Sequence, residues 1–202
     1  MRLLYTKCLG NMYIDQGRYN EAEQLFFEAL QTKRKVLGDE HLYTLESLSG
    51  LARVYTAQNR YEEAESLFTE LLEIAPRRLG EEHPFTLKFV NAFAVLRTKQ
   101  QRYDQAESLF TTALEGMCRR LDEDHPWTLE SKNDLATLYK DQAHYDKAEP
   151  LLLESLKGRL LKLGDTHPHT IESWNNLIDL YEAWGKPEKA EHWRAKLPKT
   201  EA

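Results

Sequence analysis

Residues 79–86 read Leu-Gly-Glu-Glu-His-Pro-Phe-Thr, and related copies of this stretch occur at residues 37–44, 121–128 and 163–170. The histidine of the stretch recurs every 42 residues, at His41, His83, His125 and His167. Self-similarity at a fixed period of roughly 20 to 50 residues is the signature of a repeat protein. The chain of 202 residues is therefore predicted to be a solenoid, in which each repeat packs on its neighbours.

Each repeat carries two helical patterns. Apolar residues spaced by three, four and seven residues mark a first helix, as at Leu45, Leu48 and Ala52. A second stripe of the same kind restarts after a short polar turn, as at Ala64 and Phe68. Because such a stripe is buried only when a neighbour covers it, the two helices are predicted to pack antiparallel.

Small residues on the second helix of each pair have a physical reason. Two helices approach closely only where neither contact position carries a bulky side chain. A larger residue at one of these positions is expected to wedge the pair apart. The positions are Ala22, Ala64, Ala106, Ala148 and Ala190.

The order of residues within a repeat resembles the tetratricopeptide repeat over almost the whole chain. In the second repeat the residues that carry the resemblance are Leu51, Ala52, Tyr55, Asn59, Tyr61, Ala64, Phe68 and Leu71. The usual repeat has about 34 residues. The longer repeat here, joined through Leu-Gly-x-x-His-Pro-x-Thr, resembles the variant found in kinesin light chains. The resemblance implies an all-α fold, a right-handed α-solenoid of about five antiparallel helix pairs.

The whole chain, 1–202, is expected to form a single tetratricopeptide-type solenoid domain. Its units are placed at approximately 1–42, 43–84, 85–126, 127–168 and 169–197, followed by a polar tail at 198–202. The last helix is predicted to be short and polar, and so to cap the stack.

Several positions depart from the repeat pattern, among them Leu42, which replaces the linker proline, and Ile178, which replaces a small alanine. Asp122 replaces the glycine of the linker, which predicts a different turn there. Arg97 stands where the other repeats have tyrosine, and it is either a specificity residue or a stem that covers apolar surface. Pro76 predicts a kink or an early helix end near Ala75, because proline removes one backbone donor and clashes with the preceding turn.

The repeated histidines are the first candidates for chemistry. Corresponding loops of stacked units are expected to lie roughly 10 Å apart or more, so four histidines cannot share one metal ion. Each is instead interpreted as the turn residue before the next helix, with Gly80 ending a helix at positive φ and Thr86 satisfying amide donors. No nucleophile, phosphate-loop or metal motif is present. The chain is predicted not to be an enzyme and to need no cofactor or metal.

Composition narrows the class of partner. The formal net charge of −6 disfavours nucleic acid as a partner. No signal peptide or membrane-spanning stretch is recognisable, and Cys8 and Cys118 are interpreted as buried thiols in a reducing compartment. The expected location is therefore cytoplasmic.

The predicted function is a protein-protein interaction scaffold that binds an extended peptide or protein segment in a concave groove built from the first helices. Amide side chains both donate to and accept from a peptide backbone, while lysine and arginine bind acidic side chains. The candidate peptide-binding residues are Lys7, Asn11, Arg53, Lys88, Asn91, Asn133, Thr137, Lys140 and Asn175. Acidic partner segments are favoured near Arg53, Lys88 and Lys140.

Two alternatives remain. The chain is either a self-assembly module that stacks through its terminal faces, for which exposed Trp184 and Trp193 are candidates, or the sensor portion of a larger regulatory protein. A monomer or weak self-association is expected.

Overall fold

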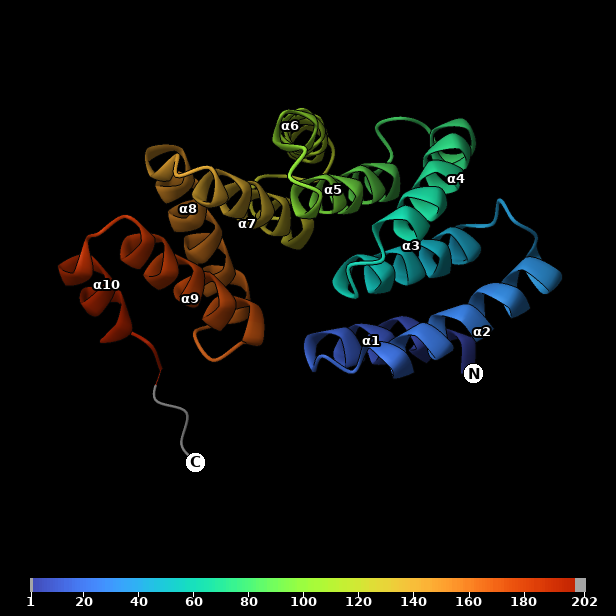
Figure 1. Cartoon of the computed structure of the whole chain (residues 1–202), viewed down its shortest axis with the longest axis horizontal. Helices are drawn as coiled ribbons and strands as arrows, with labels where there is room; N and C mark the ends of the chain where they lie inside the picture. The colour runs from blue at the N-terminus through green and yellow to red at the C-terminus, as the bar shows by residue number, and fades with distance from the viewer. Residues whose placement is uncertain (1, 199–202) are drawn as a thin grey trace. The chain divides into compact units, whose positions relative to one another are not determined.

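The computed structural model describes the backbone of residues 2–198 and the side chains of residues 6–198. Within that range the chain forms ten α-helices and no strand (Figure 1). Backbone proximity divides the chain into two compact units, Met1–Leu109 and Phe110–Ala202. The helices are α1 (Arg2–Asp15), α2 (Tyr19–Leu37), α3 (Leu42–Ala57), α4 (Tyr61–Leu79), α5 (Pro84–Lys99), α6 (Tyr103–Arg120), α7 (Pro126–Asp141), α8 (Tyr145–Leu163), α9 (Pro168–Ala183) and α10 (Pro187–Arg194).

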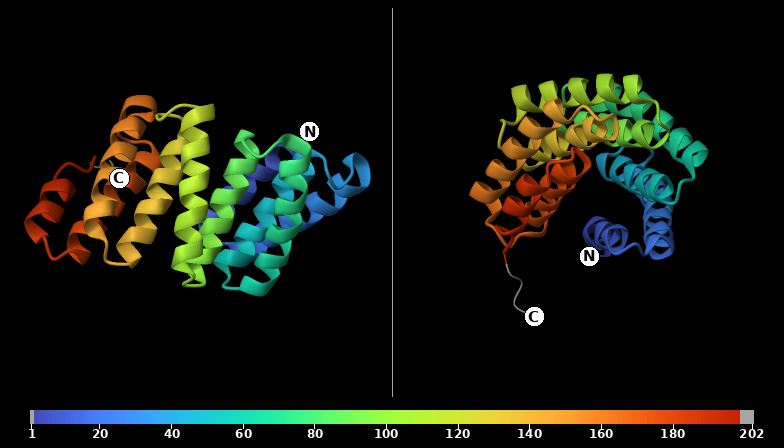
Figure 2. Two further views of the ribbon diagram at one scale, coloured as in Figure 1. Left: turned by 90° about the horizontal axis from the view of Figure 1, so that it is seen from above. Right: turned by 60° about the vertical axis from the view of Figure 1, so that its left-hand side comes forward.

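In the first unit, α1 to α5 pack in two layers. Consecutive helices contact each other, so each pair is an antiparallel hairpin that also touches the next pair (Figure 2). The backbones of α1 and α3 approach within 8 Å, as do those of α3 and α5, whereas no such approach joins α2 to α4 among the described residues. Helices α1, α3 and α5 therefore form the more closely packed layer, which we call the inner face of the first unit.

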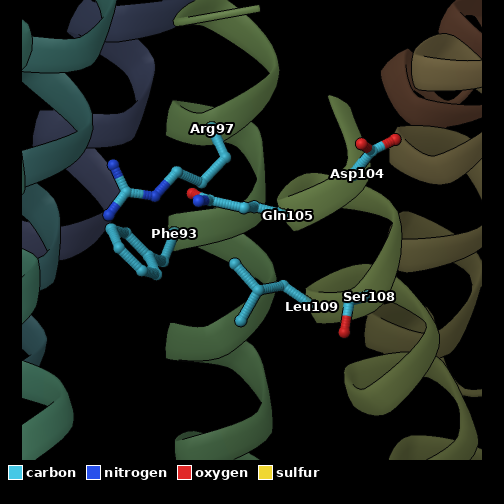
Figure 3. A pocket seen from close by; sticks show the side chains of 6 residues that line it. All are labelled: Phe93, Arg97, Asp104, Gln105, Ser108 and Leu109. Atoms are coloured by element: carbon cyan, nitrogen blue, oxygen red, sulfur yellow. The ribbon is translucent and has the colours of Figure 1, made fainter. Parts of the chain in front are cut away.

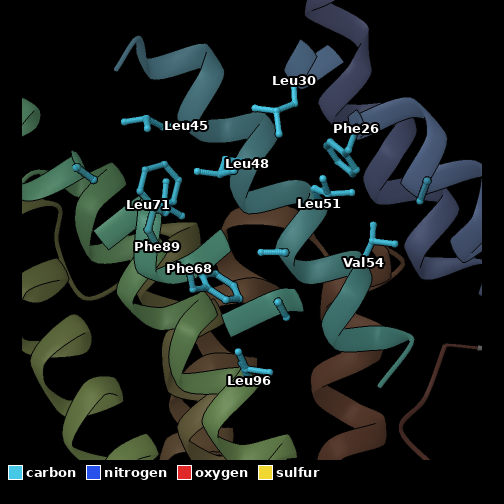
Figure 4. Close-up of a cluster of buried hydrophobic side chains, with 14 residues drawn as sticks. Phe26, Leu30, Leu45, Leu48, Leu51, Val54, Phe68, Leu71, Phe89 and Leu96 are labelled. Carbon is cyan, nitrogen blue, oxygen red and sulfur yellow. The ribbon is translucent and has the colours of Figure 1, made fainter. Parts of the chain in front are cut away.

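The core of the first unit lies between these layers and is built around two phenylalanines, Phe26 and Phe68 (Figure 4). A Cβ atom added to Gly50 would lie 2.3 Å from the Phe26 ring, so the ring packs against bare backbone there. The predicted close-contact positions are confirmed as buried, with at most 1% of each side chain exposed. They are Ala22, Ala64, Ala106, Ala148 and Ala190.

In the second unit, α7 to α10 also pack consecutively, and α7 contacts α9 as well. The buried side chains of this unit include Leu152, Trp174 and Leu177. The closing helix, α10, has only eight residues, as expected for the shortened last pair. Arg194 at its end is exposed and paired with Glu182 and Glu191, so the end of the last pair carries charge.

The loops between pairs use the repeated glycine and histidine. Gly38, Gly80 and Gly164 follow their helices with φ of 89°, 104° and 84°, which confirms the positive φ predicted for this position. The histidine that follows is the N-cap of the next helix, and its Nδ1 atom accepts a hydrogen bond from the backbone N–H two residues later, at 3.3 Å for His83. The interpretation of the histidines as turn residues is confirmed.

The role predicted for Thr86 in this loop is wrong. The capping acceptor is the ring of His83, while Thr86 is buried one turn inside the helix. The equivalent Thr44 and Thr128 donate their hydroxyls to carbonyl oxygens of the loop, at 2.8 Å and 2.7 Å. The buried hydroxyl of Thr86 has no hydrogen-bond partner among the described residues, and the histidine ring satisfies the helix amide.

The predicted difference at Asp122 is confirmed. Its φ is 147°, an unfavourable region for any residue with a side chain, and α6 ends earlier in the repeat, at Arg120. The Asp122 carboxylate accepts a hydrogen bond from the backbone N–H of Asp124 at 3.1 Å. This local bond compensates part of the cost of the missing glycine.

The early helix end predicted at Pro76 is wrong, since α4 continues to Leu79 and has the same length as α2, 19 residues. The proline removes only one helical hydrogen bond. Ala75 is fully buried, and the carbonyl of Pro76 accepts from the N–H of Gly80 at 2.9 Å. Packing of the last turn and its normal termination therefore outweigh the intrinsic preference of proline.

A glutamate on the second helix of one pair binds the first helix or the turn of the next pair. The Arg97 guanidinium and the Gln100 amide both donate to Glu65 and hold the pKa of its carboxyl at about 2, against desolvation, which acts to raise it. Such bonds fix the register of successive pairs. The distance from the donor atom to the glutamate carboxylate oxygen is 2.8 Å from Arg60 to Glu23, 2.8 Å from Arg97 to Glu65 and 2.5 Å from Tyr181 to Glu149.

The prediction that both cysteines are buried is wrong, because Cys8 is exposed and Cys118 is half-buried. Among the described helices, α1 contacts only α2 and α3, and these leave part of its apolar stripe uncovered. Met12, one turn after Cys8, is 43% exposed. None of the helices in the described range is long and apolar enough to cross a membrane.

Candidate peptide-binding face

The predicted peptide-binding residues lie on the first helix of each pair. In the first unit the predicted residues lie on the three helices of the inner face, α1, α3 and α5. They are Lys7, Asn11, Arg53, Lys88 and Asn91. In the second unit they lie on α7 and α9: Asn133, Thr137, Lys140 and Asn175.

Lys7 lies where the three helices of the inner face meet. Its ammonium group donates to the Glu46 carboxylate on α3 at 2.7 Å and lies 5.7 Å from the centroid of the Phe85 ring on α5. Phe85 is half-buried. The structure thus places a cation, a carboxylate and an aromatic ring from three helices in one cluster, of which only the cation was predicted.

Arg53 and Asn11 form a second cross-helix contact, in which the Arg53 Nη1 group donates to the Asn11 side-chain oxygen at 3.1 Å. The two residues are equivalent positions of successive repeats. A guanidinium has five N–H donors in a planar fork. The bond to Asn11 orients this fork and leaves donors for a second partner, such as a carboxylate or a peptide carbonyl.

Lys88 and Asn91 on α5 are less accessible than the pattern implied. Asn91 is only 6% exposed and Lys88 is half-buried, and both have partners within the protein. A peptide reaches these side chains only by replacing existing contacts, so they are weaker candidates than Arg53.

The three asparagines in register do not form one uniform row. Asn133 is 3% exposed, like Asn91, whereas Asn175 on α9 is exposed. Thr137 donates to the backbone carbonyl of Asn133 at 3.0 Å, and the side-chain oxygen of Asn133 has no hydrogen-bond partner. Lys140, one turn after Thr137 on α7, is half-buried, as is Thr137. Asn175 is therefore the most accessible of the residues predicted in the second unit.

Lys33 is a charged residue near this face that was not predicted. It is 5% exposed and donates to the Ser47 hydroxyl at 2.8 Å. Burial lowers the pKa of Lys33, attraction to Glu46 opposes this shift, and repulsion from Lys7 adds to it. The signal in the sequence was its position in the apolar stripe of α2, where the next two repeats have Ala75 and Met117 and the fourth has Arg159.

A shallow cavity of about 450 Å³ lies beside α5 and the start of α6 (Figure 3), and none of the predicted peptide-binding residues lines it. Its apolar part is formed by Phe93 and Leu109. Its remaining lining residues are Arg97, Asp104, Gln105 and Ser108. All six lie within the first unit.

The described residues contain no cluster of three or more metal-ligating side chains. The tryptophans considered for self-association are half-buried rather than exposed. Trp184 stacks on Tyr145 with ring centroids 5.7 Å apart, and Trp193 packs against the core of the second unit. Their rings are therefore largely used inside the unit.

The comparisons with known proteins agree with this architecture. The tetratricopeptide repeat family model matches residues 1–77 and 86–160, and the PPR repeat model matches residues 172–198. No curated protein matches the chain in sequence.

Solved structures with the same fold cover nearly all of the chain. A protein of Podosopora anserina, described as a kinesin light chain with nearly identical TPR-like repeats, is 26% identical with a TM-score of 0.68, covering 97% of this chain and 93% of that one. BtubC (BKLC) from P. vanneervenii is 23% identical with a TM-score of 0.71, covering 98% and 84%. PilW, a type IV pilus biogenesis factor, is 15% identical with a TM-score of 0.52, covering 96% and 91%. The predicted all-α, tetratricopeptide-type fold is confirmed.

Proposed function

The chain belongs to the tetratricopeptide repeat family, and from this membership we propose that it is a non-catalytic scaffold that binds an extended peptide or protein segment on the helices of its inner face. The observation that carries the proposal is Arg53, which is oriented by Asn11 across two helices and retains unused donors. Preorganised donors of this kind bind a carboxylate or a peptide carbonyl without a large ordering cost.

The surroundings of Arg53 favour a segment with mixed chemistry. Acidic side chains suit Arg53 and Lys140, whereas Glu46 already neutralises much of the charge of Lys7. The half-buried Phe85 ring beside Lys7 offers apolar contact to a neighbouring residue of the same segment. The expected ligand is therefore an extended segment with acidic and apolar residues rather than a uniformly acidic one.

Two further parts of the proposal concern the whole chain. We propose that the five pairs act as one binding domain, and within each unit the same kind of glutamate contact joins successive pairs, through Glu23 and Glu65 in the first unit and Glu149 in the second. A cytoplasmic location is supported by two cysteines that are not paired in a disulfide.

The self-assembly alternative has less support. At the end of the last pair, Arg194 occupies the repeat position where Phe26 and Phe68 fill the cores of earlier pairs. An exposed, ion-paired arginine does not offer the apolar contact that stacking of another pair requires.

The binding proposal is tested with peptides selected from a displayed random library on the immobilised protein. The best peptide is then titrated by fluorescence anisotropy against wild type, Arg53→Glu and the control Arg77→Glu, which makes the same charge change on α4. We expect roughly tenfold weaker binding for Arg53→Glu and less than about twofold change for the control. Equal affinity for all three proteins would contradict the proposal.

A further inference from the structure

The turn between α3 and α4 binds a glutamate of the preceding helix pair. The Arg60 Nη1 group and the Gln58 side-chain amide donate to the same carboxylate oxygen of Glu23, at 2.8 Å and 3.0 Å. The Gln58 side-chain oxygen accepts from Arg60 at 2.9 Å, and the guanidinium lies 4.0 Å from the centroid of the Tyr55 ring. Arg60 also pairs with Glu63 of its own helix. These contacts orient both donors toward the glutamate of the preceding pair.

The turn between α1 and α2 has the same arrangement of side chains. The equivalent residues, 42 positions earlier, are Tyr13, Gln16 and Arg18. The Gln16 side-chain oxygen accepts from Arg18 at 3.3 Å, and the guanidinium lies 4.3 Å from the centroid of the Tyr13 ring. Gln16 and Arg18 are exposed, and in the described part of the chain Arg18 forms an ion pair only with Glu21 of its own pair. Since Arg60 binds a glutamate of its own helix and one of another pair together, Arg18 is equally able to bind a second carboxylate.

Met12 on α1 is 43% exposed, although its position is buried in every other pair. The equivalent residues, each 0% exposed, are Val54, Leu96, Leu138 and Leu180. Val54 belongs to the same buried cluster as Phe26 of the preceding pair (Figure 4). Helix α1 contacts only α2 and α3 among the described helices. Met12 therefore offers an apolar contact where the other pairs receive a neighbouring helix.

Glu28 on α2 adds an acceptor for a cation. It is exposed, and its equivalent Glu70 pairs with Arg34 of the preceding pair. The same preceding helix, α2, also supplies Glu23 to the turn between α3 and α4. One helix thus makes an acidic contact near its start and a basic contact near its end.

These contacts define the helix that fits. Glu23, Phe26 and Arg34 lie on one face of α2, because residues three and eleven positions apart point in similar directions on a helix of 3.6 residues per turn. The matching helix is amphipathic, with a Glu-x-x-Phe pattern and a basic residue about two turns after the phenylalanine. The end of a second copy of the chain does not offer this pattern, because Arg194 stands three residues after Glu191 on α10.

We propose that Met12, Gln16, Arg18 and Glu28, which we call the α1–α2 docking surface, bind an amphipathic α-helix of a partner polypeptide with this pattern. The glutamate of that helix accepts from Arg18 and Gln16, its phenylalanine packs on Met12, and its basic residue pairs with Glu28. None of these four residues is among the predicted peptide-binding residues, so the docking surface and the inner face are tested separately.

The probe is a fluorescein-labelled peptide with the sequence of residues 19–37, which form α2. Because an isolated helix of this length is marginal in water, a lactam bridge joins a Gln24→Lys substitution to the glutamate at peptide position 28, on the side opposite Phe26. Anisotropy titration with the whole protein is expected to show saturable binding. Peptides that also carry Glu23→Lys or Phe26→Ala are expected to bind at least roughly tenfold more weakly. Absence of saturable binding, or unchanged affinity of either altered peptide, would overturn the proposal.

Variants of the protein locate the docking surface. Arg18→Glu is expected to weaken binding of the unaltered peptide at least roughly tenfold and to strengthen binding of the Glu23→Lys peptide. This exchange of charges separates docking on α1 from displacement of the protein's own α2, in which the peptide contacts Arg60 instead. The control Lys157→Glu makes the same charge change at an exposed position of α8 and is expected to leave binding unchanged.

Met12→Gln tests the apolar contact without changing charge. It is expected to weaken binding of the unaltered peptide roughly threefold, because the phenylalanine of the peptide loses part of its apolar contact. Equal binding of that peptide by wild type and Arg18→Glu, or by wild type and Met12→Gln, would contradict the assignment.

Discussion

Replacing Ala143 by glycine and Gly185 by alanine is expected to change the stability of the second unit in opposite directions. Both residues occupy the same position of the turn between the two helices of a pair, with φ of 59° and 69°. Both are exposed, so neither substitution alters the core. Their backbone N–H groups make the same turn bond, Ala143 to Lys140 at 2.9 Å and Gly185 to Glu182 at 3.1 Å.

The size of the expected change in the free energy of unfolding follows from the backbone conformation alone. A residue with a Cβ atom in the left-handed region costs about 1–2 kcal/mol. Glycine avoids this cost but loses about 0.5–1 kcal/mol more conformational entropy on folding. The difference predicts that Ala143→Gly stabilises by about 0.5–1 kcal/mol and that Gly185→Ala destabilises by about the same amount.

Urea unfolding followed by far-UV circular dichroism measures both changes. With a slope of about 2–3 kcal/mol/M, the midpoint is expected to rise by about 0.3 M for Ala143→Gly and to fall by about 0.3 M for Gly185→Ala. Shifts of the same sign in both variants would refute the reasoning, since the turn geometry would then not control stability.

Three further predictions concern buried and charged side chains. Glu65 has a folded pKa of about 2, below its ordinary 4.5, so its contribution to folding stability is present above pH 4.5 and is lost as the pH falls towards 2. Glu65→Gln is expected to flatten this part of a plot of the urea midpoint against pH. A plot that is unchanged in the variant would count against the contact with Arg97. Lys33→Met is expected to stabilise the protein by about 1 kcal/mol near neutral pH. The difference in stability between the variant and wild type is expected to narrow towards pH 10.5, because the folded pKa of Lys33 is lowered. A destabilised Lys33→Met in the same urea assay would refute this. Ala64→Leu is expected to destabilise by about 3 kcal/mol, and a melting temperature equal to that of wild type would contradict close helix contact at that position.

The sequence was sufficient to predict the helices because their signal repeats in every copy. The apolar stripes, the contact alanines such as Ala64, and the positive φ of Gly80 each follow from local geometry or from burial against an equivalent neighbour. The errors fall where two local preferences compete. Pro76 opposes its helix but sits beside buried Ala75, and both His83 and Thr86 are capable of capping the same helix.

The candidate site was less predictable because it depends on contacts between helices. A period of 42 residues aligns Asn91, Asn133 and Asn175 but does not fix how much of each side chain the neighbours cover. Two of the three are buried, and only Asn175 is exposed. In the same way, the pairing of Lys7 with Glu46 depends on the packing of α1 against α3, which no local pattern specifies.

The most direct test of peptide binding at the inner face is site-specific photo-cross-linking of the selected peptide. A benzoylphenylalanine residue is placed either at Cys8, which is exposed on α1 of the inner face, or at Phe27, which is 49% exposed on α2 of the other layer. The account predicts a cross-link from position 8 that excess unlabelled peptide removes, and none from position 27. A cross-link from position 27 alone, or equal cross-linking from both positions, would contradict it.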